Sequence, residues 1–162
     1  MATKKEELDV LKKNIEMLDL PLKNTSTNIV FGKGDPDAEI IFIGEAPGAN
    51  EDMQGLPFVG RAGKQLDSLL NSIGLTIEDV YIANILKYRP PKNRNPNPKE
   101  IETHVPYLVD QISIIQPKVI CTLGNFSTKF VLANFDSTKM KTISGITKLH
   151  GVPKRVQFRE QV

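Results

Sequence analysis

The chain has 162 residues, of which 40% are hydrophobic and 25% charged, ordinary values for a globular protein that exclude a chain disordered throughout. A single cysteine, Cys121, excludes an intramolecular disulfide framework and any metal site built from several thiolates. The longest apolar run is far too short to span a membrane, and the charged N-terminus does not resemble a signal peptide. We therefore expect one domain, residues 1–162, in a cytoplasmic protein.

The formal net charge of +2 is unevenly distributed along the chain. Residues 87–99 carry five basic side chains and no acidic one, and residues 139–162 carry six basic side chains and one acidic one. The rest of the chain therefore has a net charge of −8. An acidic body with two basic segments indicates an anionic partner, commonly nucleic acid.

The sequence predicts helices and strands in alternation. Thr3 and Glu6 have the spacing of a capping box, which opens an amphipathic helix over residues 4–19. Further along, short apolar runs predict buried strands, and amphipathic patterns predict helices: strands at 39–44, 80–85 and 118–123, helices at 62–73, 97–115 and 126–133. Pro106 is expected to kink or split its helix, and the weakly alternating tail predicts a hairpin turning near His150.

This order predicts an α/β fold, a three-layer α/β/α sandwich with a short, mainly parallel central sheet. In open parallel sheets, ligands bind at the carboxyl ends of the strands, so we expect a site in the loops after Ile43, Ala83 and Leu123. The third of these loops gives the weakest signal, a glycine at Gly124 before a helix N-terminus that could meet a phosphate. Neither histidine has neighbours at metal-ligand spacing, so we expect no metal site.

The first loop, from Gly44 to Gly63, is rich in glycine and proline, which indicates a shaped backbone that a ligand approaches closely. Glu45 and Glu51 fall near the strand end, where carboxylates can orient water or stabilise a cation. Phe58 offers a flat apolar face within this polar loop. The alternative is a tight connection with solvated acids and a phenylalanine in the core.

The second loop begins at Asn84, whose amide offers an acceptor and two donors and suits the edge of a base. The alternative is an asparagine that caps the end of the sheet. The basic residues that follow are interleaved with prolines, which stiffen the loop and lower the entropy lost when its charges dock on phosphate. A solvated basic loop is the other interpretation.

Three runs of the sequence have the order and spacing of one enzyme family. They are N-I-V-F-G-K-G-D-P-D-A-E-I-I-F-I-G-E-A-P-G from Asn28, E-D-x-x-G-x-P-F-V-G-R-A-G from Glu51, and V-Y-I-A-N-I-L-K-Y-R-P-P-x-N-R-x-P from Val80. Together they closely resemble the family 4 uracil-DNA glycosylases from about Asn28 to the C-terminus. The resemblance implies removal of uracil from DNA by cleavage of the N-glycosidic bond, after the base is flipped into a pocket.

The resemblance also assigns roles to residues. The positions that would bind uracil are Gly44, Glu45, Ala46, Phe58 and Asn84, with Phe58 stacking on the base and Asn84 reading its O4 and N3–H edge. Glu45 or Glu51 would act in catalysis, and Glu51 falls where the family has an acidic residue near the base. The positions that would contact DNA are Pro47, Gly48, Lys87, Arg89, Asn93, Arg94 and Gly124.

Two features depart from the family pattern. Its members typically bind a [4Fe–4S] cluster through four cysteines, and the matching positions here are Met17, Leu20, Tyr88 and His104. Because a cluster needs thiolate ligands, we expect no cluster and mostly apolar packing in its place. Family members also continue into an H-P-[AS] loop whose histidine contacts uracil O2, and the sequence reaches Val162 without it. Losing such an electrostatic group typically costs about 10²–10³ in rate.

We therefore expect a uracil-DNA glycosylase domain that is truncated at its C-terminus, a monomer that binds uracil-containing DNA and no membrane. It is either a fragment of a longer protein or a degenerate member with little activity. The alternative function is a catalytically impaired or inactive member that binds DNA or a protein partner. A relative that traps uracil covalently is disfavoured because the basic loop lacks a K-R-R-I-H insertion. An α/β domain for a phosphate-bearing small molecule is the remaining alternative.

Overall fold

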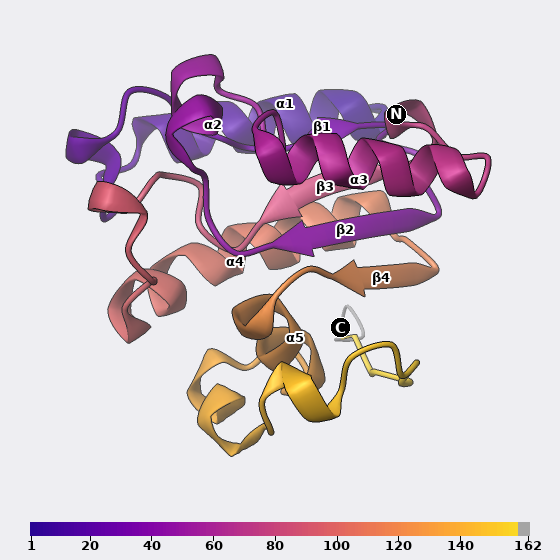
Figure 1. Cartoon of the computed structure of the whole chain (residues 1–162). Helices are drawn as coiled ribbons and strands as arrows, with labels where there is room; N and C mark the ends of the chain where they lie inside the picture. Colours follow the sequence, from indigo (N-terminus) through magenta and orange to yellow (C-terminus); the bar gives the residue numbers. More distant parts are fainter. Residues whose placement is uncertain (159–162) are drawn as a thin grey trace.

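The computed structural model describes residues 1–158, and its centre is a four-stranded sheet in the order β1, β3, β2, β4 (Figure 1). The strands are β1 (Lys33–Gly34), β2 (Ile40–Gly44), β3 (Tyr81–Asn84) and β4 (Val119–Thr122). β2 pairs in parallel with β3 and with β4, whereas the short β1 runs antiparallel to β3. The mainly parallel sheet predicted from the sequence is confirmed.

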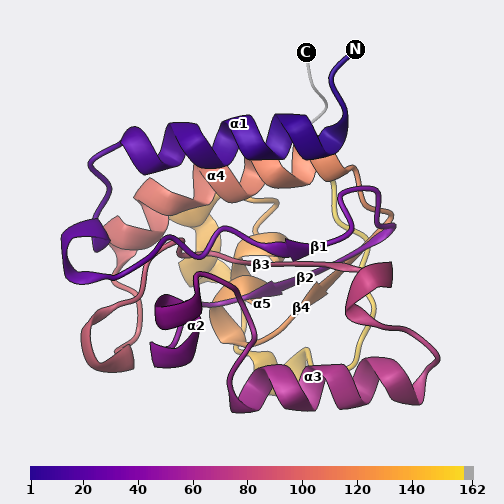
Figure 2. The same ribbon diagram turned by 90° about the horizontal axis from the view of Figure 1, so that it is seen from above.

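Helices cover both faces of the sheet, as the predicted sandwich requires (Figure 2). On one face lie α1 (Lys4–Met17) and α4 (Pro98–Ile115), and on the other lies α3 (Arg61–Ser72). The short α2 (Ala49–Gln54) sits in the loop between β2 and α3, and α5 (Asn125–Leu132) follows β4. Short 3₁₀ helices occur at Lys23–Thr25, Ile77–Asp79, Pro91–Asn93, Ser137–Thr142 and Ile146–Lys148. Within residues 1–158, no helix combines the length and apolar character needed to cross a membrane.

The core is divided by the sheet because alternate strand residues point to opposite faces. Ile41 and Ile43 belong to the larger cluster, which α1, α4 and α5 complete, while Ile82 packs with Leu66 and Leu70 beneath α3. β3 is buried throughout and β2 is mostly buried, which explains their continuous apolar runs, whereas β4 is only partly buried. The register of β2 and β3 sets Gly44 directly opposite Asn84, so two of the predicted loops leave the sheet side by side.

Local chemistry fixes where the helices on the first face begin. Thr3 and Glu6 form the predicted capping box of α1, and Asn97 and Glu100 form that of α4. The expectation that Pro106 splits α4 is wrong, because the helix runs unbroken from Pro98 to Ile115. Pro106 lies on the exposed face of α4, where water can hydrate the carbonyl that the proline leaves without a helical donor.

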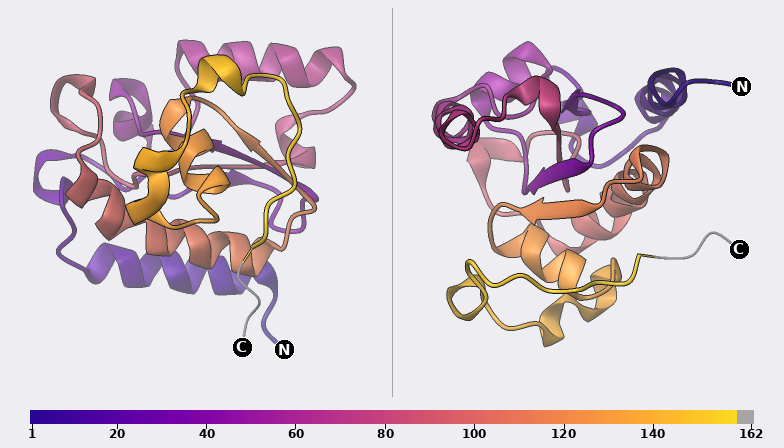
Figure 3. Two further views of the ribbon diagram at one scale, coloured as in Figure 1. Left: turned by 90° about the horizontal axis from the view of Figure 1, so that it is seen from below. Right: turned by 90° about the vertical axis from the view of Figure 1, so that its right-hand side faces the viewer.

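The predicted hairpin near His150 is also wrong within the described residues, where no strand follows β4. The backbone instead closes local turns, with the amides of Leu149 and His150 both donating to the carbonyl of Ile146 at 2.9 and 2.8 Å. Residues 159–162, the end of the predicted hairpin, lie outside the described part of the chain. The right panel of Figure 3 shows that residues 133–158 stay on the β4 side of the molecule, away from α2 and α3.

Candidate functional site

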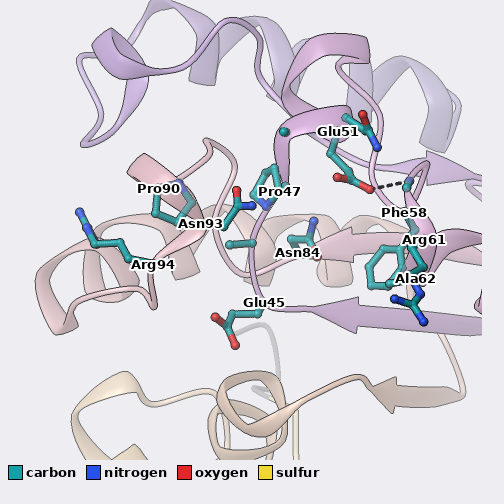
Figure 4. A pocket seen from close by; sticks show the side chains of 15 residues that line it. Glu45, Pro47, Glu51, Phe58, Arg61, Ala62, Asn84, Pro90, Asn93 and Arg94 are labelled. Carbon is teal, nitrogen blue, oxygen red and sulfur yellow. Dashed lines mark hydrogen bonds between the residues drawn. The ribbon is translucent and has the colours of Figure 1, made fainter.

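The loops that follow β2 and β3 enclose a pocket of about 430 Å³ (Figure 4). Most of the residues predicted for the site line it, from three segments of the chain: Glu45, Ala46, Pro47, Gly48, Ala49, Asn50, Glu51, Phe58, Gly60, Arg61, Ala62, Asn84, Pro90, Asn93 and Arg94. A larger hollow of about 800 Å³ lies between β4, α5 and the tail, but none of the predicted site residues lines it. The chemistry predicted from the sequence therefore gathers in the smaller pocket.

Gly44, Phe58 and Asn84 meet at the floor of this pocket. A Cβ atom placed on Gly44 would lie 2.3 Å from Oδ1 of Asn84 and 2.7 Å from the ring of Phe58. Such distances leave no room for a side chain at position 44. The absence of one allows the amide edge and the aromatic ring to converge, which gives the pocket a flat apolar wall and a polar edge.

Asn84 carries an unused hydrogen-bond acceptor. Its side chain lies at the end of β3 and is only 2% exposed. Within residues 1–158, its Oδ1 is the one buried side-chain nitrogen or oxygen without a hydrogen-bond partner. Leaving a buried polar group unpaired costs about 1–3 kcal/mol, so native proteins rarely do so without a reason. A ligand that brings a donor to this atom would satisfy it.

Contacts to the backbone of Phe58 fix its position. Its φ of 51° is unusual for an aromatic residue, and such strain persists only where surrounding contacts maintain it. Lys33 donates from Nζ to the Phe58 carbonyl at 3.0 Å. Gly63 packs so closely that an added Cβ would lie 1.9 Å from the same carbonyl oxygen. Nothing in the local sequence marks Lys33 as a support for Phe58, because the two are 25 residues apart.

The two predicted catalytic carboxylates have different surroundings. Glu51, in the first turn of α2, accepts hydrogen bonds at Oε1 from the backbone amides of Val59 at 3.0 Å and Gly60 at 2.8 Å. Its carboxylate therefore braces the loop that carries Phe58. Glu45 directly follows β2, is half-buried, and makes no side-chain hydrogen bond with the described residues. Burial raises the pKa of Glu45 above its ordinary value.

The basic loop does not present all of its charges to solvent. The prediction that Lys87 contacts DNA is wrong, because its side chain is fully buried behind the pocket. Arg94 is exposed and forms a two-pronged ion pair with Glu100, at 2.6 and 2.9 Å. Arg89 is half-buried and donates from Nε to Asn93 at 2.7 Å.

Gly124 lies apart from the pocket. It precedes α5 with a φ of 106° and does not line the pocket where the other predicted residues gather. The basic residues of 139–158, which belong to the second basic segment, do not line it either. The first basic segment is therefore the one beside the pocket.

The positions at which the family has cluster cysteines hold side chains that do not fit an iron–sulfur cluster. His104 is buried, accepts from the Lys87 amide at Nδ1 over 3.0 Å, and has Nε2 3.0 Å from the carbonyl of Pro21. Tyr88 packs edge-on against the imidazole ring with centroids 6.2 Å apart. Leu20 is buried, whereas Met17 is exposed. Within residues 1–158, no group of three or more His, Cys, Asp or Glu side chains could hold a metal ion.

Comparison with known proteins assigns this architecture to a family. The model of the uracil DNA glycosylase superfamily matches residues 31–157. A type-4 uracil-DNA glycosylase of Archaeoglobus fulgidus is 49% identical over 85% of this chain and 69% of its own length. Relatives with the same description from Sulfurisphaera tokodaii and Thermotoga maritima are 47% and 42% identical, over 83% and 94% of this chain.

The chain spans 60% and 77% of the lengths of those two relatives, so each extends beyond the part that matches. The family match covers both loops that form the pocket floor, including Gly44, Phe58 and Asn84. The sequence, the α/β fold and the comparisons agree, and the chain belongs to the uracil DNA glycosylase superfamily, with type-4 enzymes among its relatives.

Proposed function

We propose that the chain is a DNA repair glycosylase that removes uracil from DNA by hydrolysing the N-glycosidic bond and leaves an abasic site. The unpaired Oδ1 of Asn84 is the observation on which this proposal depends. Uracil presents an N–H donor at N3 beside a carbonyl acceptor at O4, and an asparagine amide matches both. The type-4 uracil-DNA glycosylases to which the chain is similar support the same substrate.

Base selection follows from this edge. Cytosine has an acceptor at N3 and a donor at its exocyclic amine, the reverse of uracil. It would leave buried groups unpaired at a cost of about 1–3 kcal/mol for each group. Phe58 would stack on the base, and the bare backbone at Gly44 provides the space beside it. The base must leave the duplex to reach this floor, because the pocket lies at the ends of buried strands.

The reaction breaks the bond between C1′ of the sugar and N1 of uracil. The bond's electron pair leaves with the base as the uracil anion, positive charge develops on the sugar, and water adds at C1′ while losing a proton to the Glu45 carboxylate. We assign Glu45 to orient this water and to stabilise the developing charge. Its carboxylate is free of hydrogen bonds to the described residues, and its raised pKa makes it a better proton acceptor than an ordinary carboxylate. Glu51 instead positions Phe58 through the loop that it braces.

The DNA backbone would be held at the pocket rim. Pro47, Gly48, Asn93 and Arg94 line the pocket, and Arg89 donates a hydrogen bond to Asn93. Phosphate contacts from these residues would make binding weaken as salt rises. We propose a monomer as the active unit, because the floor of the pocket and the residues at its rim form a complete base-binding site without a second copy.

We further propose that the protein folds without an iron–sulfur cluster, with His104 and Tyr88 filling the corresponding space. Iron analysis of protein purified without oxygen should find far less than one cluster per chain. Stoichiometric iron would contradict this proposal.

The test of function is a glycosylase assay on single- and double-stranded oligonucleotides that contain one uracil. Abasic product above an Asn84→Ala control is expected. A second candidate, a DNA-binding member without turnover, is favoured by one observation: neither His104 nor His150 lines the pocket. Salt-sensitive binding of DNA with no abasic product would support this second candidate and exclude the first.

A further inference from the structure

Lys87 is the largest fully buried side chain within residues 1–158, and no carboxylate pairs with it there. Its Nζ atom donates to the backbone carbonyl of Asn84 at 2.8 Å and to Oε1 of Gln111 at 2.5 Å. Burying an ammonium group away from water and from acids is costly. A buried lysine without a carboxylate partner therefore needs a structural or functional reason, whereas an exposed lysine does not.

The contacts of Lys87 connect three parts of the fold. Gln111 lies on α4, and its side-chain Nε2 donates a hydrogen bond to the carbonyl of Phe31 at 2.9 Å. The backbone amide of Lys87 donates to His104, and its carbonyl accepts from Val30 at 2.8 Å. The loop after β3 is thereby anchored to α4 and to the segment that precedes β1.

The same contacts bear on the residue that reads the base. On the β2 side, the amide of Ile85 donates to the carbonyl of Gly44 at 3.0 Å, next to Asn84. On the α4 side, the carbonyl of Asn84 accepts from Lys87. The end of β3 is thus held on the β2 side by the Ile85 amide and on the α4 side by the Lys87 ammonium.

We propose that Lys87 is a positioning residue for base recognition: its ammonium holds the Asn84 carbonyl and thereby aims the Asn84 amide into the pocket. This inference deepens the proposed glycosylase function, since the base it concerns is the one assigned there. Hydrogen bonds from a charged donor are about twice as strong as neutral ones, so the strength of the hydrogen bond from Lys87 to the Asn84 carbonyl depends on protonation of Lys87.

Protonation of Lys87 should change near neutral pH. Burial lowers its pKa to about 7. The titratable groups that face the network are neutral there, because burial lowers the pKa of His104 to about 4 and raises that of the Tyr81 hydroxyl. The hydrogen bond from Lys87 to the Asn84 carbonyl therefore weakens as the pH rises above 7.

The test compares wild type with Lys87→Met, which keeps most of the side-chain length without the charge. The control is Ile112→Val, a small change at a buried apolar position beside Gln111 in α4. On a single-stranded uracil oligonucleotide, Lys87→Met should lower kcat by about tenfold while KM changes less, because phosphate contacts at the rim are intact. Wild-type kcat should also fall above pH 7, and Lys87→Met should lack this fall. Unchanged kcat and an unchanged pH profile would overturn the proposal.

A second measurement does not need turnover. In NMR spectra, the Ile85 amide and the Asn84 side-chain amide of wild type should shift with a midpoint near pH 7, and this titration should vanish in Lys87→Met. If wild type makes no abasic product, the glycosylase function fails and this titration alone decides the role of Lys87. If Lys87→Met does not fold, Gln111→Glu replaces it. A carboxylate beside the ammonium should move the midpoint to higher pH, and an unmoved midpoint would overturn the proposal.

Discussion

The floor and the rim of the pocket are built in different ways. The floor, Gly44, Phe58 and Asn84, is held by the half-buried Lys33, which donates to the Phe58 carbonyl, and by the fully buried Lys87, which donates to the Asn84 carbonyl. The rim, residues 89–94, is largely exposed; Arg89 bonds to Asn93 within the rim, and Arg94 bonds to the buried Glu100 at the start of α4. The difference indicates that the floor sets which base is cleaved and how fast. The rim sets how tightly DNA binds.

The strongest test of this comparison replaces an asparagine in each region. Asn84→Ala removes the base-reading amide, and the cleavage rate on uracil DNA should fall by about 10²–10³. Asn93→Ala removes the rim asparagine that accepts from Arg89 and should change the rate by less than about threefold. Single-turnover rates on one oligonucleotide give both values. Equal losses in the two variants would contradict the division into floor and rim.

His104, which bonds to the loop behind the floor, and Glu100, which bonds to the rim, should contribute to stability over different pH ranges. Burial lowers the pKa of His104 to about 4, so between pH 6.5 and 4 the unfolded chain binds the proton that the folded chain rejects. Stability is therefore lost as pH falls through this window, by about 3 kcal/mol at its end. Urea unfolding at several pH values measures this loss, which His104→Leu should abolish.

Glu100, the buried partner of the rim residue Arg94, provides the comparison. Its hydrogen bonds with Arg94 lower its pKa, so its contribution to stability is present above pH 4.5 and is lost as pH falls below that value. Glu100→Gln should therefore remove stability at neutral pH and flatten only the most acidic part of the profile. If Glu100→Gln instead flattened the profile between pH 6.5 and 4, the assignment of that window to His104 would be wrong.

Two glycines of the first loop test how firmly Phe58 is held. An alanine at Gly63 would place its Cβ 1.9 Å from the Phe58 carbonyl, and we expect Gly63→Ala to lower the free energy of unfolding by about 1–3 kcal/mol. At Gly60 the nearest atom would be 3.2 Å away, so Gly60→Ala should cost less than about 1 kcal/mol. Thermal and urea unfolding measure both. Equal stability of the two variants would show that the Phe58 backbone moves freely.

Much of this arrangement could be predicted from the sequence, and the exceptions share a cause. Apolar runs located β2, β3 and β4 within one or two residues, and the end of a run placed Asn84 in the site. Lys87 was assigned to DNA because a lysine among basic residues usually faces water. Its acceptor Gln111 is 24 residues away, and only the fold brings the two together. The sequence likewise leaves Glu45 and Glu51 as alternatives for catalysis, because the hydrogen bonds that Glu51 accepts from Val59 and Gly60 depend on a loop conformation that no local pattern encodes.

The smallest expected effect concerns the rim charges. Arg89→Ala should weaken binding of uracil DNA a fewfold and reduce the slope of log affinity against log salt by about 1 if Arg89 meets one phosphate. Lys154→Ala, in the second basic segment, should leave both quantities unchanged, because Lys154 lines the hollow beside β4 and not the pocket. Binding to an oligonucleotide at several salt concentrations measures both variants. An equal loss of slope in Lys154→Ala would extend the DNA path across the β4 side, and the rim would then be one part of a longer basic surface. Cleavage rates at saturating DNA should stay the same in both variants, since neither side chain contacts the floor.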